Sequence, residues 1–265
     1  MKNLLIHFIL FSTILIISIA LFYKYGKNIW YPYYKQYSYK EHILPCKECE
    51  PCNSTKIVTI EKECQDNSFT TTEENLTSEQ KLKHHLADSD FIVYPKKLTI
   101  IGLKHEKRLE VWGEQQDSKK YVKIATYPFT AFSGILSPKL KEGDRQIPEG
   151  IYKISYLNPN SKFHLSMRIN YPNEFDKKMA KKEGRTNLGG DIMIHGSNRT
   201  IGCIPIGDEK IEELYFLAQK VGIQNINVIL SPVDFRQIDV KIKSNKHPWI
   251  SKLYKEIKEK MKPFQ

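Results

Sequence analysis

Residues 191–203 read DIMIHGSNRTIGC, and the interpretation of the whole chain starts from this stretch. A strand-like apolar run ends at His195, and a short loop bounded by Gly196 and Gly202 leads to Cys203. A cysteine is a good nucleophile only as the thiolate, and a nearby imidazole is the usual base that generates it near neutral pH. The pattern therefore predicts a cysteine–histidine site. The competing interpretation is a loop histidine beside an inert buried cysteine.

The residues around the cysteine support the catalytic interpretation. Gly202 leaves room for a substrate to approach the backbone, and Gly196 leaves room beside His195. Cys203 precedes a helix expected to begin near Asp208. A donor-rich turn at that place is expected to lower the thiol pKa and to stabilise an oxyanion.

The segment around this stretch has the pattern of a β-rich domain, which we assign to residues 90–240. Short alternating or β-branched runs are separated by turn residues, and they lie at 92–94, 97–103, 108–112, 121–127, 151–156, 163–169 and 226–230. Two helices are expected, one over 174–182 capped by Asn173 and one over 209–221 capped by Asp208.

Four segments, in order, carry a resemblance to a known family. They read GDRQIPEGIY (143–152), FHLS (163–166), INYPNEFD (169–176) and GDIMIHGSNRTIGCIPIGDEKIEELY (190–215). Together they resemble the L,D-transpeptidase catalytic domain (YkuD family), in its branch with a short His-to-Cys spacing. The resemblance covers about residues 95–235. It implies a mainly β fold, sandwich- or barrel-like, with a few helices.

The resemblance also implies roles for the residues of the opening stretch. Cys203 would be the nucleophile and His195 the general base. A backbone carbonyl next to the histidine, from Gly196 or Ser197, would be the third member. Most members of the family carry a second histidine before the cysteine and an arginine after it, and this sequence has neither.

In the other members of the family, the arginine that this sequence lacks is expected to help hold an acidic peptide substrate. Arg199 and Arg185 are the candidates to replace it, because a planar guanidinium suits a carboxylate. His164, Tyr171 and Asn173 lie in the resembling motifs and are expected to line the cleft.

Residues 1–23 predict a membrane anchor. Leu4–Phe22 is a run of 19 residues without charge, about the length that a bilayer requires. A cleaved signal peptide is the alternative, with residues 18–20 as the cleavage site. The lysines that follow the run would place the remainder in the cytoplasm by the positive-inside rule. The family's substrate favours the opposite orientation, with the catalytic domain in the periplasm of a bacterial cell.

Residues 24–89 are predicted to be a cysteine-containing stalk or linker. Four of the five cysteines cluster there, at Cys46, Cys49, Cys52 and Cys64. Two local disulfides in an oxidising compartment would leave Cys203 as a free thiol. A metal or cluster site on the same four thiols is the alternative.

The charge is concentrated at the end of the chain. The formal net charge is +11, and residues 241–265 carry eight lysines against two glutamates. Apolar residues recur on one helical face over 249–261, so a basic amphipathic helix is expected. Its apolar face would contact either a membrane or the domain itself. Anionic wall polymers or phospholipid headgroups fit this charge better than nucleic acid.

The sequence thus predicts an enzyme of cell-wall remodelling without a cofactor or resident metal. Its donor would be a peptidoglycan tetrapeptide, and its acceptor an amine or water. Cross-linking, attachment to an amine, and hydrolysis as a carboxypeptidase or amidase all share the same chemistry at Cys203. A non-catalytic wall-binding module and a redox or metal protein built on the cysteine cluster are the alternatives from other classes.

Overall fold

The computed structural model describes residues 76–116, 118–238 and 246–265, which belong to one compact unit, Asn67–Gln265. The predicted anchor and the four clustered cysteines lie outside these residues. Within the described ranges, no helix is both long enough and apolar enough to cross a membrane.

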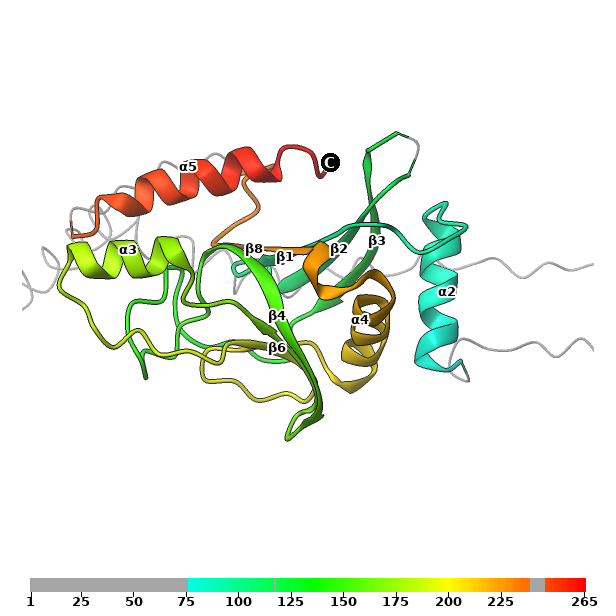
Figure 1. Cartoon of the computed structure of the whole chain (residues 1–265), viewed down its shortest axis with the longest axis horizontal. Helices are drawn as coiled ribbons and strands as arrows, with labels where there is room; N and C mark the ends of the chain where they lie inside the picture. Colours follow the sequence, from blue (N-terminus) through cyan, green and yellow to red (C-terminus); the bar gives the residue numbers. More distant parts are fainter. Residues whose placement is uncertain (1–75, 117, 239–245) are drawn as a thin grey trace, which may run out of the picture. The chain divides into compact units, whose positions relative to one another are not determined.

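An eight-stranded mixed sheet organises the described part of the chain, in the order β3-β2-β1-β8-β4-β5-β6-β7 (Figure 1). The strands are β1 (Leu98–Leu103), β2 (Arg108–Glu114), β3 (Tyr121–Pro128), β4 (Gly150–Ser161), β5 (His164–Ile169), β6 (Met193–His195), β7 (Ile204–Pro205) and β8 (Ile226–Ser231). Only the β1–β8 and β6–β7 pairs are parallel. The β-rich prediction is confirmed, and the eight strands are hydrogen-bonded in one continuous order.

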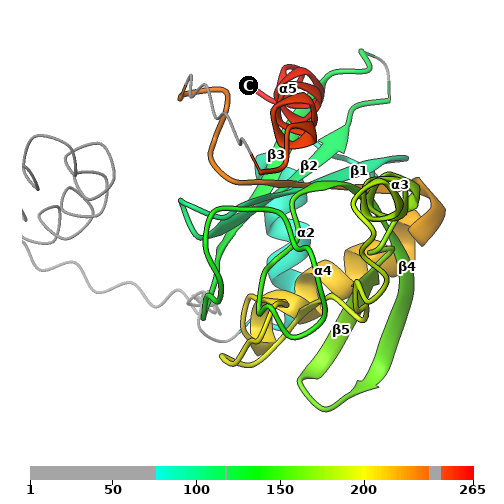
Figure 2. The same cartoon turned by 90° about the vertical axis from the view of Figure 1, so that its left-hand side faces the viewer.

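The long strand β4 joins the two halves of this sheet. Its first residues pair with β8, whereas its later residues pair with β5. The β4–β5 hairpin therefore extends beyond the central strands (Figure 2). Through β5 it carries the short pair β6–β7, on which the predicted site lies.

Helices cover both faces of the sheet. They are α2 (Ser78–Asp88), α3 (Glu174–Lys182), α4 (Asp208–Val221) and α5 (Trp249–Met261), with a short 3-10 turn η2 (Ile223–Asn225). Helices α2 and α4 lie on one side of the central strands and α5 on the other (Figure 2). Apolar side chains of α4, among them Ile211, Leu214 and Ala218, are buried in the larger core.

The linker was predicted to continue to residue 89, but residues 78–88 of that range form helix α2. Thr77 and Gln80 form a capping box at its start, and Leu82 and Leu86 are buried against the domain. The sequence around it is polar, and its two leucines find their partners only on elements far along the chain. The run 92–94, predicted as a strand, forms no strand, and Ile92 is fully exposed.

Helix α5 has the predicted amphipathic pattern, and its apolar face is packed on the domain. Its buried residues are Ile250, Leu253, Tyr254, Ile257 and Met261. They form a second core with residues of β1, β2 and β8. Of the two contacts expected for this face, the structure shows the one with the domain.

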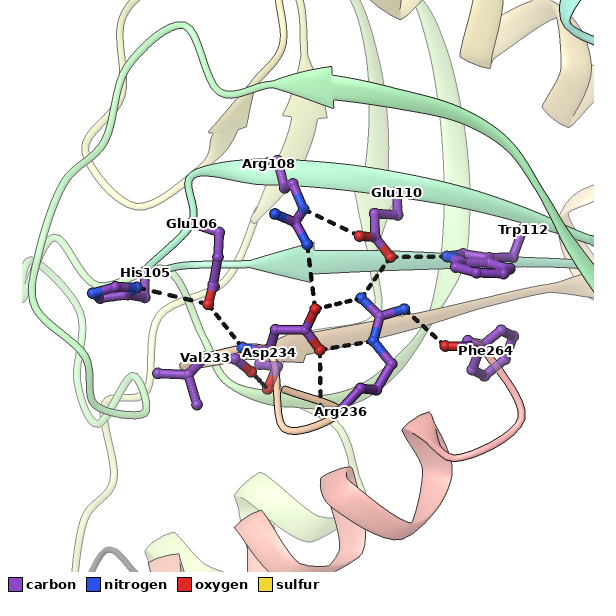
Figure 3. Close-up of polar contacts among 10 residues, drawn as sticks. His105, Glu106, Arg108, Glu110, Trp112, Val233, Asp234, Arg236 and Phe264 are labelled. Carbon is purple, nitrogen blue, oxygen red and sulfur yellow. Dashed lines mark hydrogen bonds and ion pairs between the residues drawn. The ribbon is translucent and has the colours of Figure 1, made fainter. Parts of the chain in front are cut away.

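A polar network fixes the end of the chain beyond α5 (Figure 3). The guanidinium of Arg236 donates to Asp234, to Glu110 Oε2 at 2.8 Å and to the carbonyl of Phe264 at 2.9 Å. Glu110 and Asp234 are themselves buried. Because both carboxylates are also bonded to Arg108, the network joins β2, the segment after β8 and the C-terminal turn.

Candidate active site

The parallel pair β6–β7 brings the two ends of the predicted catalytic loop to one place. Strand β6 ends at His195, and β7 begins directly after Cys203; His195 lies opposite Pro205 in the register. The backbone N–H of Met193 donates to Cys203 Sγ at 3.4 Å, and the thiol donates to the carbonyl of Asp191 at 3.7 Å. Within the described residues no hydrogen bond joins Cys203 to His195.

His195 is buried and held in a defined orientation. Its Nδ1 lies 2.5 Å from the carbonyl oxygen of Gly196, so the N–H at Nδ1 donates and Nε2 remains to accept a proton. Burial lowers the pKa of His195, and the Gly196 carbonyl opposes this effect. The neutral imidazole is therefore favoured, as a general base requires.

Other atoms occupy the position that a Cβ on Gly196 would take. A Cβ at this position would meet Asp208 Oδ1, and would lie 2.8 Å from the carbonyl oxygen of Phe163. Asp208 itself accepts a hydrogen bond from the N–H of Ser197 at 2.6 Å. The predicted cap role of Asp208 is therefore wrong: α4 is preceded by Gly207, and the carboxylate holds the catalytic loop instead.

A second set of bonds shapes the loop before Cys203. Thr200 Oγ1 donates to the carbonyl of Cys203 at 2.7 Å and accepts from the N–H of Gly202 at 3.1 Å. Gly202 has a φ of +131°, which L side chains rarely adopt. Its missing Cβ would lie 3.1 Å from the carbonyl oxygen of Gln146, so the loop abuts the 129–149 segment.

The pKa of the Cys203 thiol is shifted in the direction opposite to the one predicted. Burial raises the pKa of Cys203 above its usual value, and the charge of Asp191 adds to this effect. The Met193 N–H and the charge of Lys139 act in the opposite direction but do not outweigh burial. The expected lowering of the thiol pKa is therefore wrong, because the half-buried sulfur loses more from desolvation than it gains from neighbouring donors.

Tyr171 and Asn173, which were expected to line the cleft, are hydrogen-bonded to backbone carbonyls of neighbouring segments. Tyr171 is buried, and its hydroxyl donates to the carbonyl of Leu188 at 3.2 Å. Asn173 caps α3 through a capping box with Asp176 and donates to the carbonyl of Ile151 at 2.9 Å. The cap was predicted correctly, and within the described residues neither side chain has a hydrogen bond to the loop from His195 to Cys203.

His164 is paired with α4 at the tip of the β4–β5 hairpin. Its Nε2 lies 2.6 Å from Glu212 Oε1, and Glu212 also accepts a hydrogen bond from Ser78 of α2. Its neighbour Phe163 instead contacts the site, with its ring centroid 4.6 Å from that of His195. Phe163 is part of the FHLS motif, but nothing in the sequence shows which of the two side chains faces His195.

The two candidate arginines lie in different surroundings. Arg199 is exposed, and in the described part of the chain it has no hydrogen bond or ion pair. Arg185 donates through Nε to Glu183 Oε2 and through Nη1 to the carbonyl of Leu140, both at 2.8 Å.

Arg185 lines a groove of about 790 Å³. Three segments of the chain form its walls: residues between 135 and 146, residues 183–187, and the pair 246–247. Gln146 belongs to this lining, and its carbonyl oxygen lies 3.1 Å from the position that a Cβ on Gly202 would take.

A comparison with protein families gives a match over this part of the chain. Residues 98–228 match the YkuD model, described as the L,D-transpeptidase catalytic domain. The domain belongs to the YkuD family. The match includes β1 to β7, the first residues of β8, and both ends of the loop from His195 to Cys203.

This L,D-transpeptidase-family domain is similar to named proteins in sequence and to solved structures. The YafK protein of Escherichia coli (strain K12), provisionally named an L,D-transpeptidase, is 28% identical over 158 residues. The match covers 58% of this chain and 61% of YafK, and an E. coli O157:H7 YafK gives the same values.

Two solved structures are also similar. The helical cell shape determining protein Pgp2 of Campylobacter jejuni is 23% identical, with a TM-score of 0.42, over 66% of this chain and 60% of Pgp2. Bd1075 of Bdellovibrio bacteriovorus is 20% identical, with a TM-score of 0.38, over 66% of this chain and 57% of Bd1075.

Proposed function

We propose that this protein is a cysteine-dependent acyltransferase that acts on peptidoglycan stem peptides. The orientation of His195 carries the proposal, because its Nδ1 is bonded to the Gly196 carbonyl at 2.5 Å while Nε2 is left to serve as a base. The family match of the domain supports the substrate class. The lowered pKa of the His195 imidazole supports its neutral, proton-accepting form.

The reaction follows from these two side chains. Cys203 Sγ attacks the carbonyl carbon of the donor peptide bond while His195 Nε2 takes the thiol proton. The tetrahedral intermediate then breaks its C–N bond, and His195 returns the proton to the leaving amine, which leaves a thioester on Cys203. An acceptor amine, or water, attacks the thioester and restores the thiol.

The raised pKa of Cys203 favours proton transfer during attack over a thiolate that exists before substrate binds. In the resting protein the thiol is engaged with the Asp191 carbonyl at 3.7 Å, so substrate must replace this weak contact. The loop bonds made by Asp208 and Thr200 keep both reacting residues in place meanwhile.

The test uses the purified full-length chain in detergent with a defined tetrapeptide muropeptide, with and without an added amine. Mass spectrometry of the products distinguishes transfer to the amine from hydrolysis. Intact-protein mass spectrometry should detect an acyl adduct on the wild type and none on Cys203→Ala or Cys203→Ser. Turnover retained by Cys203→Ala would exclude the proposal.

The site of action is part of the same proposal. Residues 1–23 are proposed to anchor the chain in the bacterial inner membrane, with the catalytic domain in the periplasm. An alkaline phosphatase fusion after Asp90 should then be active and a cytoplasmic reporter at the same position silent. The opposite pattern would place the domain away from peptidoglycan.

A further inference from the structure

Asp191 lies beside the thiol of Cys203 and carries an exposed carboxylate. We propose that this carboxylate binds a primary ammonium group of the peptide substrates, and that Arg168 occupies it until the ammonium displaces the arginine. The inference rests on the proposed function and deepens it, because it adds a cation-binding residue to the same site. In stem peptides such a group has two sources, the free amine on the diamino acid of the donor and the amine of an acceptor.

The backbone of Asp191 is part of the wall around the thiol. Its carbonyl oxygen accepts from Cys203 Sγ at 3.7 Å, and the N–H of Met193 donates to the same sulfur at 3.4 Å. Asp191 has a φ of +51°, in the left-handed region that aspartate and asparagine adopt more readily than most other residues. An asparagine can therefore replace Asp191 without disturbing the backbone next to the sulfur.

The side chain of Asp191 is open to a ligand. It is 78% exposed, and a Cβ on the preceding Gly190 would meet nothing within 4 Å. The charge also reaches the reacting atom, since burial and, to a lesser extent, the charge of Asp191 raise the pKa of the Cys203 thiol. An ammonium bound to this carboxylate would therefore lie within electrostatic range of the sulfur.

Arg168 compensates Asp191 only weakly in the resting protein. Its Nη1 lies 3.2 Å from Asp191 Oδ1, and the two side chains are 43% and 78% exposed. An ion pair with this exposure contributes little stability, because water solvates both charges. The guanidinium also lies over the ring of Tyr156, 5.7 Å from its centroid. It therefore keeps a favourable contact when a ligand takes the carboxylate.

The other charges around the thiol are already engaged. Lys139 acts on the pKa of Cys203 in the opposite direction to Asp191, but it is buried and bonded to Asp144 at 2.6 Å. Asp208, the carboxylate that holds the catalytic loop, accepts a backbone N–H at 2.6 Å. Of these charged groups, Asp191 is the one that a ligand can reach without breaking a bond of the loop, and its sign selects a cation.

The two sources would use the carboxylate at different stages. A donor ammonium would hold the stem peptide while Cys203 attacks. An acceptor ammonium would bind after the thioester has formed and would lose one proton to water. Its neutral nitrogen then forms the C–N bond as the C–S bond breaks, and the second proton passes through His195 Nε2 to the sulfur. In both cases Asp191 raises the concentration of the ammonium near the sulfur and forms no covalent bond.

The donor source is tested by binding to full-length Cys203→Ala. A stem tetrapeptide with a free diamino acid amine, and the same peptide with that amine acetylated, are titrated by calorimetry. The free amine should bind about three- to fivefold more tightly, the range of an exposed ion pair. Asp191→Asn in the same background should remove this preference, since it keeps the size of the side chain and loses its charge.

The acceptor source is tested by transfer in the Cys203 protein at pH 7. Glycinamide, which is mostly cationic at this pH, is compared with hydroxylamine, which is mostly neutral. Asp191→Asn should raise KM for glycinamide about three- to fivefold with kcat changed little, and should leave KM for hydroxylamine in place. Loss of the Asp191 charge also acts on the thiol pKa, but this effect is common to both nucleophiles and cancels in the ratio of the two KM values.

Two further variants separate ammonium binding from damage to the site. Arg168→Gln removes the competing cation, so ammonium binding should become tighter, the opposite of the effect of Asp191→Asn. Asp90→Asn is the matched control, because Asp90 is also exposed and has a φ of +58°, but it follows α2 and lies outside the family match. It should change neither the affinity nor the KM values.

An ammonium preference that Asp191→Asn removes supports the inference, and the arm in which it occurs identifies the source. Three results would overturn it: no ammonium preference in either arm, a preference that Asp191→Asn leaves unchanged, or weaker ammonium binding in Arg168→Gln with thermal unfolding as in the parent. The calorimetry does not depend on turnover. A failure of the proposed function would instead appear as turnover retained by Cys203→Ala, so the two failures are distinguishable.

Discussion

Phe163, in the turn of the β4–β5 hairpin, stacks on His195 at the end of β6, with ring centroids 4.6 Å apart and planes inclined by 33°. The contact places an aromatic ring over the imidazole that we propose as the base. The neighbour of Phe163 in the sequence, His164, is paired with Glu212 on α4. The hairpin therefore contributes to the desolvation that lowers the pKa of His195.

Removing this ring should change the pH dependence of the reaction. In Phe163→Leu the imidazole becomes more hydrated, so the pKa of His195 rises toward its usual value. A base must be neutral to act, so the acid limb of kcat/KM moves to higher pH. We expect a several-fold loss near pH 5.5 and roughly unchanged activity near pH 8.

Tyr156→Leu is the matched control for this change. Tyr156 is a half-exposed aromatic on the same hairpin that packs over Arg168 instead of the catalytic histidine. Its removal should leave the pH profile in place. The carboxylate of Asp208 accepts from the N–H of Ser197, and neither substitution removes this bond, so Asp208 is not expected to account for a shift. A Phe163→Leu profile that falls uniformly at every pH would assign Phe163 a packing role only.

Gly196→Ala should remove activity through the loop's geometry. The new Cβ would meet Asp208 Oδ1 and the Phe163 carbonyl, the latter at 2.8 Å, so the carboxylate or the loop must move. Either movement disturbs the bond from His195 to the Gly196 carbonyl. We expect at least a hundredfold lower kcat, roughly the effect of a misplaced catalytic group.

Gly190→Ala serves as the control, because nothing lies within 4 Å of its Cβ position. It should retain activity and thermal stability close to those of the wild type. Comparable activity in the two variants, measured on the same muropeptide, would show that the space around Gly196 is not required.

The thiol should react slowly with an alkylating agent in the folded protein. Burial raises the pKa of Cys203, so little thiolate exists near neutral pH. The rate of iodoacetamide labelling should increase with pH, and the midpoint of this increase should lie at a higher pH than for an ordinary cysteine. His195→Gln should change this pH profile little. A labelling rate that is flat down to acidic pH and falls in His195→Gln would instead indicate a stable thiolate–imidazolium pair.

The parts of the fold that could be predicted from the sequence are those specified by local signals. Asn173 caps α3 because a polar side chain precedes the helix and an acceptor follows three residues later, at Asp176. The buried face of α5 follows from apolar residues at helical spacing. The loop from His195 to Cys203 could be predicted because a glycine lies at each of its ends.

The parts that could not be predicted depend on contacts between distant residues. Helix α2 has only two buried leucines, and their burial requires a docking surface that the sequence does not reveal. The bond between Glu183 and His247 joins residues 64 positions apart, and no local sequence pattern predicts it. The raised pKa of Cys203 likewise reflects burial by the folded chain.

The carboxyl of Asp176 yields a prediction on stability. Desolvation raises its pKa to about 6, and bonds from the Asn173 N–H and the Tyr152 hydroxyl only partly oppose this effect. The unfolded chain titrates near 3.9, so the folded state disfavours the charged form. The associated stabilisation is complete below the unfolded value and is lost as pH rises through about 6.

Asp176→Asn keeps an oxygen that can accept from the Asn173 N–H, and it cannot ionise. Relative to the wild type, the variant should therefore gain about 2 kcal/mol in unfolding free energy between pH 4 and pH 7.5, since one pKa unit corresponds to about 1.4 kcal/mol. Urea denaturation of both proteins at the two pH values measures this difference, and comparing them cancels every other titrating group. Glu174→Gln, which removes an exposed carboxylate from the same helix, controls for the loss of charge. An equal pH dependence in Asp176→Asn and the wild type would mean that this carboxyl is hydrated in solution and that the start of α3 opens near Tyr152.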